Sequence, residues 1–225
     1  PLDISPALET EVKSVHFTRN FSDKVIAELS GAAPFWIVRR EKLDQLLLEK
    51  AISYGTEILK LATVESLKKE NEHWLLICSN KNIYQSKFLV IADGSQSQWA
   101  QFLKLGPSNP KFAKTITIRL KGLGDLEKDS VRFDFCSIKY GFTWAFPLKD
   151  CTNIGIGSFI GDFNINDPFL IKKVVRDFGF TEVNFKPICK ELRIWNGTNK
   201  IHNETALAVG DAASLCDPFL AEGIR

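Results

Sequence analysis

The chain has 225 residues, 44% of them hydrophobic and 25% charged, and 29 basic against 27 acidic residues leave a net charge of +2. This composition excludes a disordered protein, because enough apolar surface exists to offset chain entropy by burial. Basic residues are scattered among acids, which argues against nucleic acid as a partner. No apolar run approaches the ~20 residues of a transmembrane segment, so we expect a cytoplasmic protein or one peripheral to a membrane.

Two further counts bear on the class of protein. Five cysteines, with no CxxC pair and no histidine spaced for zinc, favour reduced, mostly buried thiols over disulfides or a metal site. Methionine is absent throughout, even at position 1. We therefore expect this sequence to be an internal fragment of a longer protein.

The first half of the chain predicts strands around one helix. Residues 1–38 hold short apolar segments between prolines and glycines. A helix is predicted over residues 40–54, where leucines recur at three- and four-residue steps and Gly55 supplies a stop. A polar turn at 80–82 predicts a hairpin. The strand-like segments here are 57–64, 74–78 and 83–85.

Two short apolar runs, at residues 88–92 and 206–209, each stop at an Asp beside a Gly. Such runs are typical of strands buried on both faces of a parallel sheet. Between the two runs, the pattern predicts an antiparallel sheet and a helix over 168–178, with Asp167 as N-cap and Gly179 as the stop. The strand-like segments of this sheet are 115–120, 131–136, 142–148 and 154–160.

The two strand ends are the first candidate ligand-binding features. One ends at Asp93 and Gly94, the other at Gly210 and Asp211. In open α/β sheets ligands bind at the carboxyl ends of strands, where an acid can accept hydrogen bonds from ribose or ribityl hydroxyls and a glycine lets the backbone approach the ligand. Taken alone, each pair is more simply explained as an ordinary Asp-Gly turn.

A third segment, residues 217–225, follows the second strand end closely. Its Pro218 and Gly223 stand at the mouth of an incipient helix. The free N–H groups of a helix start favour negative charge on a ligand, such as a flavin ring oxygen or a pyrophosphate. The combination favours a ligand site over two unrelated turns.

These motifs occur in the order and spacing of a known flavoprotein superfamily. Arg40-x-x-Leu43-Asp44 opens a helix, Ala92-Asp93-Gly94-Ser95 closes a strand, and Val209-Gly210-Asp211-Ala212-Ala213 is followed by Pro218 and Glu222-Gly223-Ile224. They resemble the FAD-binding signatures of the p-hydroxybenzoate-hydroxylase-like flavoproteins. The aromatic segment 142–147 is similar to the Tyr/Phe-x-Trp-x-Phe-Pro motif of the geranylgeranyl reductase family. Within the superfamily, the chain most resembles that family.

The resemblance implies an α/β fold, α+β in part, in which a doubly wound FAD-binding domain is interrupted by an antiparallel β-sheet substrate domain. Residues 1–110 and 200–225 would belong to the FAD-binding domain and residues 111–199 to the substrate domain. The family's N-terminal Gly-rich dinucleotide motif has no counterpart in this sequence. We therefore expect this fragment alone to be inactive.

The resemblance also implies a cofactor site. Asp93 and Gly94 would approach the pyrophosphate of FAD, and Asp211 would bind a ribityl oxygen. The residues expected to contact FAD are Arg40, Asp93, Gly94, Gly210, Asp211, Pro218, Gly223 and Ile224. For Arg40 a simpler explanation stands beside this one, namely a solvated arginine at a helix start.

For the substrate, the resemblance implies an isoprenoid chain bound by Phe142, Trp144 and Phe146. Apolar rings hold a hydrocarbon because binding comes from buried apolar area. The alternative is that alternating aromatics on a strand form one face of a core. The three histidines lie away from every motif, so no catalytic residue is assigned.

The implied activity is reduction of carbon-carbon double bonds in a geranylgeranyl-type isoprenoid, with hydride passing from NADPH or NADH through FAD. The substrate would be a small molecule taken from solution or from a membrane. Two alternatives stay open. A FAD-dependent aromatic-hydroxylase-like monooxygenase would share every FAD motif, and a binding module would hold no flavin.

Overall fold

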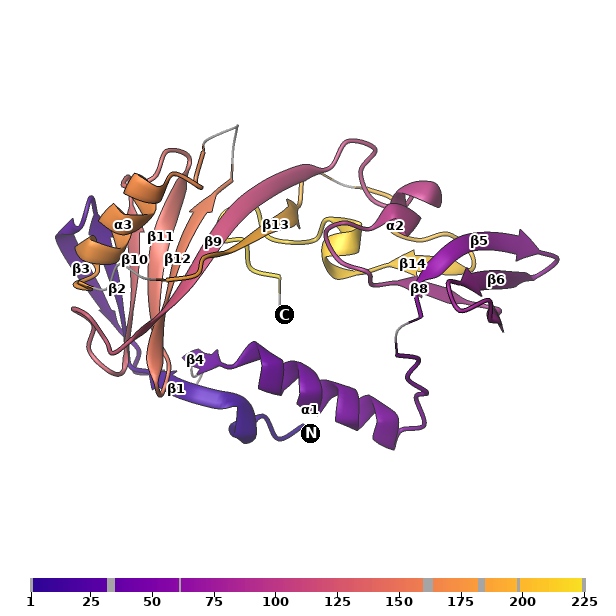
Figure 1. Ribbon diagram of the computed structural model, residues 1–225, viewed down its shortest axis with the longest axis horizontal. Coiled ribbons are helices and arrows are strands. Elements are labelled where there is room, and N and C mark those ends of the chain that lie inside the picture. Colours follow the sequence, from indigo (N-terminus) through magenta and orange to yellow (C-terminus); the bar gives the residue numbers. More distant parts are fainter. Residues whose placement is uncertain are drawn as a thin grey trace. The chain divides into compact units, whose positions relative to one another are not determined.

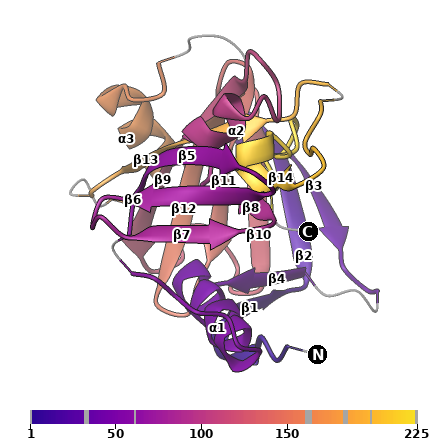
Figure 2. The same ribbon diagram turned by 90° about the vertical axis from the view of Figure 1, so that its right-hand side faces the viewer.

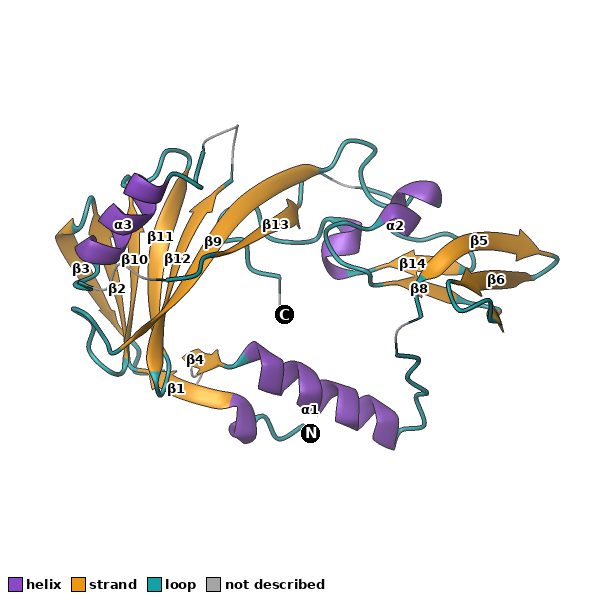
Figure 3. Ribbon diagram, in the orientation of Figure 1, coloured by secondary structure: helices purple, strands orange, loops and turns teal. Residues whose placement is uncertain are grey.

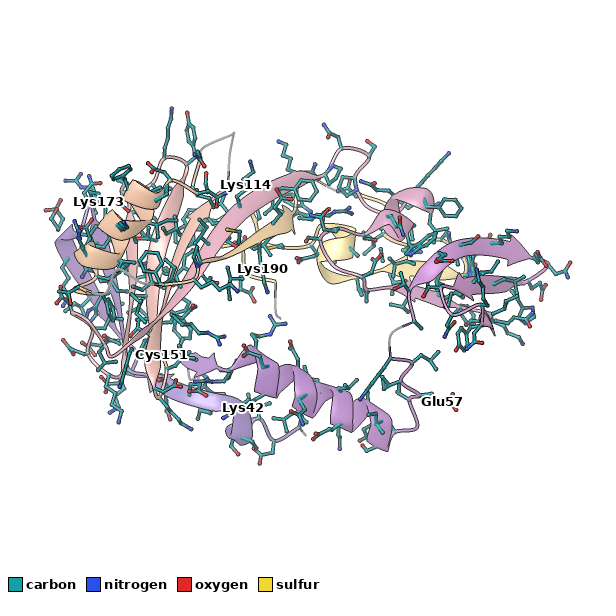
Figure 4. All side chains as sticks on the ribbon, in the orientation of Figure 1. Lys42, Glu57, Lys114, Cys151, Lys173 and Lys190 are labelled. Carbon is teal, nitrogen blue, oxygen red and sulfur yellow. The ribbon has the colours of Figure 1, made fainter. Side chains whose placement is uncertain are left out.

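The computed structural model describes residues 2–31, 35–60, 62–159, 164–181, 185–197 and 199–223, and strands predominate over helices (Figure 1, Figure 3). The chain divides into two compact units, residues 1–56 with 114–190 and residues 57–113 with 191–225. Glu57, Lys114 and Lys190, labelled in Figure 4, mark where the chain passes from one unit to the other.

Seven strands form the main sheet: β2 (Ser14–Arg19), β3 (Ser22–Glu28), β9 (Lys111–Lys121), β10 (Ser130–Phe135), β11 (Gly141–Pro147), β12 (Cys151–Ser158) and β13 (Ile188–Ile194). Their order is β13-β9-β12-β11-β10-β2-β3. The predicted antiparallel sheet is present in β9 to β12. It is extended by β2, which pairs in parallel with β10.

One face of this sheet packs against α3 (Pro168–Asp177). The helix lies where the sequence predicts it, because Asp167 caps it by accepting a hydrogen bond from the N–H of Phe169 at 2.9 Å, and Gly179 follows its end with φ +83°. Its apolar side chains meet branched residues of β9 and β12 in the core. That core includes Ile116, Ile118, Ile154, Ile156, Ile171, Val174, Val175 and Phe178.

The 3-10 turn η1 (Ser5–Ala7) precedes β1 (Leu8–Val12), which pairs antiparallel with β4 (Phe35–Val38). The chain then passes from β4 into α1 (Arg40–Ser53). The predicted helix over 40–54 is confirmed. Buried Glu9 pairs with Arg39 at 2.8 Å, and Arg39 also pairs with Asp150 at 2.6 Å. Burial alone would raise the pKa of Glu9, but hydrogen bonds from Arg39 and the N–H of Lys149 lower it overall. This cluster ties the start of α1 to the β11–β12 turn.

The second unit contains β5 (Val64–Glu70), β6 (His73–Cys78), β7 (Ile83–Ser86), β8 (Leu89–Ile91), α2 (Gln98–Phe102), β14 (Ala206–Ala208) and the 3-10 turn η2 (Gly210–Ala213). The first three strands form an antiparallel sheet, seen side by side in Figure 2. The predicted hairpin is confirmed as β6–β7. The strand expected at 57–64 instead spans 64–70, because its one buried side chain, Leu67, lies among polar neighbours and gives no apolar run.

The two predicted strands are present as β8 and β14, and the structure pairs them in parallel with each other. Ile91, Ala206 and Ala208 join the core of this unit with Leu67 and Trp74. The expectation that both faces would be buried is wrong, since Phe88 is 69% and Val90 59% exposed. Alternation along so short a strand turns Val90 away from the core that Ile91 enters.

The predicted domain bounds, 1–110, 111–199 and 200–225, stay a prediction, because compactness does not say which residues hold a cofactor or a substrate.

Among the described residues no helix combines the length and apolar character needed to cross a membrane. The five cysteines are free thiols. The expectation that most are buried is wrong, since Cys136 follows β10 in a turn and Cys189 lies on the edge strand β13, and both are exposed.

Candidate functional site

The carboxyl ends of β8 and β14 lie side by side. Ile91 pairs with Ala208, and the N–H of Val209 donates to the carbonyl of Ile91 at 3.0 Å. Asp93 and Asp211 follow these two strand ends. The structure therefore brings the two predicted Asp-Gly features to one edge of the parallel pair.

Gly94 and Gly210 leave the backbone of both strand-end turns open. Gly94 has φ +81° and Gly210 has φ +55°, and a β-carbon at either position would meet no atom within 4 Å. Other residues adopt this backbone region at a cost, so glycine suits both turns. The space beside each turn is free for a ligand to approach the backbone closely.

A buried arginine that the sequence did not single out joins the two turns. Arg193 on β13 is 4% exposed. Its Nη2 donates to the carbonyl of Ser97, after β8, at 2.8 Å, and its Nη1 donates to the carbonyl of Ala212, after β14, at 3.5 Å. Its buried Nε has no hydrogen-bond partner among the described residues.

At this edge of the parallel pair, the buried guanidinium of Arg193 interacts electrostatically with the carboxylates of Asp93 and Asp211. Burial lowers the pKa of Arg193, while the carboxylates of Asp93 and Asp211 act in the opposite direction. A guanidinium nevertheless stays protonated in proteins. The only sequence signal for this residue is a single arginine between Leu192 and Ile194, in an otherwise strand-like segment.

A cavity of about 660 Å³ opens beside the second strand end. It is lined by Trp195, Gly210, Leu215, Asp217, Pro218, Glu222 and Gly223. Three of these are predicted FAD contacts, namely Gly210, Pro218 and Gly223. Of the other two residues predicted to contact FAD in this region, Asp211 is not among the lining residues and Ile224 lies outside the described residues. The structure thus gathers three residues of the second and third motifs around one space.

Cys216 lies close to Gly223, where a β-carbon would be 3.9 Å from its Sγ. Burial, followed by the charges of Asp211, Asp217 and Glu222, raises the pKa of the Cys216 thiol to about 12. Because the thiolate is the nucleophilic form, this cysteine is neutral and unreactive near pH 7.

Arg40 lies in the first unit, on the opening turn of α1. Its side chain is 56% exposed and makes a two-pronged ion pair with Asp44, with Nε to Oδ1 at 3.1 Å and Nη2 to Oδ2 at 3.2 Å. This is the environment that the solvated-arginine explanation describes. Its contact with FAD stays a prediction.

Phe142, Trp144 and Phe146 lie on the sheet face opposite α3. Their ring centroids are 5.6 Å apart from Phe142 to Trp144 and 6.3 Å from Trp144 to Phe146. Phe142 is 4% exposed, whereas the other two rings are half-buried. The rings that continue this network are Phe17 on β2, Phe133 and Phe135 on β10, and Phe159 after β12.

Two glycines of β12 make room for Trp144. Gly155 is the Cα partner of Trp144, and Gly157 is that of Phe142. A β-carbon at Gly155 would overlap the indole of Trp144, and one at Gly157 would lie 2.8 Å from Cζ of Phe159. The indole therefore rests on bare backbone. Sequence reasoning missed this pairing because its only local signal is the alternation of Gly with Ile over residues 154–157.

No known family model matches the chain. The digeranylgeranylglycerophospholipid reductase of Methanococcus vannielii is 24% identical over 216 residues, which cover 89% of this chain and 54% of that protein. The chain spans about half the length of the curated relatives it matches.

Two solved structures show the fold. A geranylgeranyl bacteriochlorophyll reductase-like protein of Thermoplasma acidophilum gives a TM-score of 0.79 at 21% identity, covering 97% of this chain and 59% of that one. The halogenase PltM in complex with phloroglucinol and FAD gives a TM-score of 0.72 at 13% identity, covering 96% and 50%. The predicted fold class and the resemblance to the geranylgeranyl reductase family are confirmed.

Proposed function

We propose that this protein is a FAD-dependent oxidoreductase that reduces carbon-carbon double bonds of a geranylgeranyl-type isoprenoid with hydride from NADPH or NADH. The observation that carries the proposal is the face of the main sheet opposite α3, which carries Phe142, Trp144 and Phe146 and is called the ring-lined face below. Support comes from relatives named for the reduction of a digeranylgeranyl lipid and from a FAD-containing structural neighbour.

The strand-end turns fit FAD by the chemistry of their groups. The carboxylates of Asp93 and Asp211 accept hydrogen bonds of the kind that sugar and ribityl hydroxyls donate. The open backbone at Gly94 and Gly210 suits the close approach of a cofactor. In this assignment the Asp93-Gly94 turn approaches the pyrophosphate through the open backbone at Gly94, the carboxylate of Asp93 accepts from a sugar hydroxyl, and Asp211 holds a ribityl oxygen.

The flavin ring would lie beside the third segment, where Pro218 and Gly223 would flank it. When bound, FAD would supply the hydride chemistry, and the protein would supply position and electrostatics. Arg193 would keep the two acids at a fixed spacing, since it bonds to the turn that follows each strand.

The ring-lined face would bind the hydrocarbon and exclude water. On β10 and β11 this face carries only apolar side chains, because alternation places Arg132, Asp134 and Thr143 on the other face. A hydrocarbon gains about 25 cal/mol for each Å² of apolar area that it buries, without needing polar partners. A small phenol would need convergent polar groups, which favours the reductase over a hydroxylase.

The test uses the protein expressed from its complete gene. With its flavin chemically reduced and oxygen excluded, a geranylgeranyl lipid should reoxidise the flavin and gain two hydrogen atoms per reduced double bond, as read by mass spectrometry. A product that forms only in air and is heavier by one oxygen atom would replace the proposal with the aromatic-hydroxylase-like monooxygenase. A folded protein without flavin would favour the binding module.

Asp211→Ala should weaken FAD binding by about tenfold to a hundredfold, because it removes a charged hydrogen-bond acceptor of about 1.5–3 kcal/mol. Flavin absorbance of the purified protein and titration of the apoprotein with FAD measure the effect. Asp129→Ala is the control, since Asp129 is a 41% exposed aspartate whose surface ion pair with Lys13 contributes little. Equal loss of flavin from both variants would reduce the Asp211 effect to general destabilisation.

A further inference from the structure

Trp195 lines the cavity whose wall also includes three residues predicted to contact FAD. It follows the end of β13, and its N–H donates to the carbonyl of Cys216 at 2.8 Å. Ile194 and Cys216 also form an isolated parallel bridge. These contacts fix the backbone of Trp195 next to the segment after η2. Its side chain is 47% exposed and lines the cavity.

The wall of this cavity favours a flat, uncharged group. Gly210 and Gly223 contribute no side chain, and the indole of Trp195 is the one aromatic ring among the described lining residues. Asp217 and Glu222 bring carboxylates to the same wall, and among the described lining residues there is no basic side chain. Like charge disfavours a diphosphate here, whereas a ring system can stack on the indole.

We propose that Trp195 stacks its indole on the isoalloxazine ring of FAD and forms one wall of the flavin pocket. The inference rests on the proposed function and adds a residue that no sequence motif includes. Singly exposed aromatic side chains are common. The position of Trp195 in a cavity with two glycine walls, and not its exposure, therefore carries the proposal.

The experiment measures the fluorescence of bound flavin in the protein expressed from its complete gene. A stacked indole quenches flavin emission by donating an electron to the excited ring, so Trp195→Leu should raise the emission per bound flavin several-fold. Loss of the stacking contact should also weaken FAD binding by about twofold to tenfold. Trp36→Leu is the matched control, because Trp36 on β4 is 40% exposed, and it should change neither value.

Trp195→Phe separates stacking from folding. It keeps a ring that is a poorer electron donor, so the flavin should stay bound with emission between those of the wild type and Trp195→Leu. Unchanged emission per bound flavin in Trp195→Leu would overturn the inference. If the leucine variant does not fold, unchanged emission per bound flavin in Trp195→Phe would overturn it instead. A folded wild-type protein without flavin overturns the proposed function, and the inference with it.

Discussion

Arg193→Met should lower the free energy of unfolding by about 3 kcal/mol. A hydrogen bond from a charged donor contributes about 1.5–3 kcal/mol, and a buried acceptor left without its donor costs about 1–3 kcal/mol. The substitution leaves the carbonyl of Ser97 without the donor now at 2.8 Å and the carbonyl of Ala212 without the donor at 3.5 Å. Thermal and urea unfolding of the same preparation measure the loss.

Two further variants define the origin of that effect. Arg193→Lys keeps the charge but reaches fewer acceptors than a guanidinium, so its stability should fall between those of the wild type and Arg193→Met. Arg119→Met removes a 45% exposed arginine paired with Glu41 and should cost less than about 1 kcal/mol. If Arg193→Met proves as stable as Arg119→Met, the hydrogen bonds of Arg193 to the two turns contribute nothing measurable to the free energy of unfolding.

Gly155→Ala should destabilise the main sheet by about 1–3 kcal/mol or more, the usual cost of forcing an extra carbon into a packed interior. The added methyl group would overlap the indole of Trp144, whose Cα lies opposite that of Gly155 in the β11–β12 ladder. Either the ring leaves its place or the two strands separate. Denaturant unfolding, followed by the near-ultraviolet signal of the indole, measures both the cost and the displacement.

A double-mutant cycle with Trp144→Ala tests this cause. The single variant Trp144→Ala should itself be destabilised, because it removes a large half-buried ring. In its absence the methyl group at position 155 has room, so Gly155→Ala should cost little in that background. Costs that simply add in the double variant would mean that the clash lies elsewhere.

Local signals explain what the sequence predicted well. The helices over 40–54 and 168–178 carry their own periodicity and stop signals, and Asp167 supplies a cap that the structure uses. Both strands of the parallel pair were predicted because each is a short apolar run with an Asp-Gly ending, whereas their pairing with each other was not predicted. Each of these inferences needs only a few neighbouring residues.

Contacts between distant residues explain what the sequence could not predict. Arg39 and Arg40 are adjacent and alike, yet Arg39 pairs with buried Glu9 while Arg40 faces solvent. Nothing near Arg193 in the chain indicates that its acceptors are the carbonyls of Ser97 and Ala212. In the candidate site, motifs predicted the glycines and acids, whereas the arginine and the tryptophan that accompany them depend on how the strands are arranged.

The interleaving of the two units has a consequence for the way the chain folds during synthesis. Thr18 on β2 bonds to Asp134 on β10, a partner 116 residues later. At about 5–20 residues per second, a ribosome needs roughly 6–23 s to deliver that partner. Until then the edge of β2 that faces β10 stays unpaired, although β3 can pair with the other edge soon after it is made, and β8 likewise waits for β14 near the other end of the sequence. Slower translation or colder growth lengthens this exposure, so the yield of native protein should depend on chaperones that hold nascent strands apart.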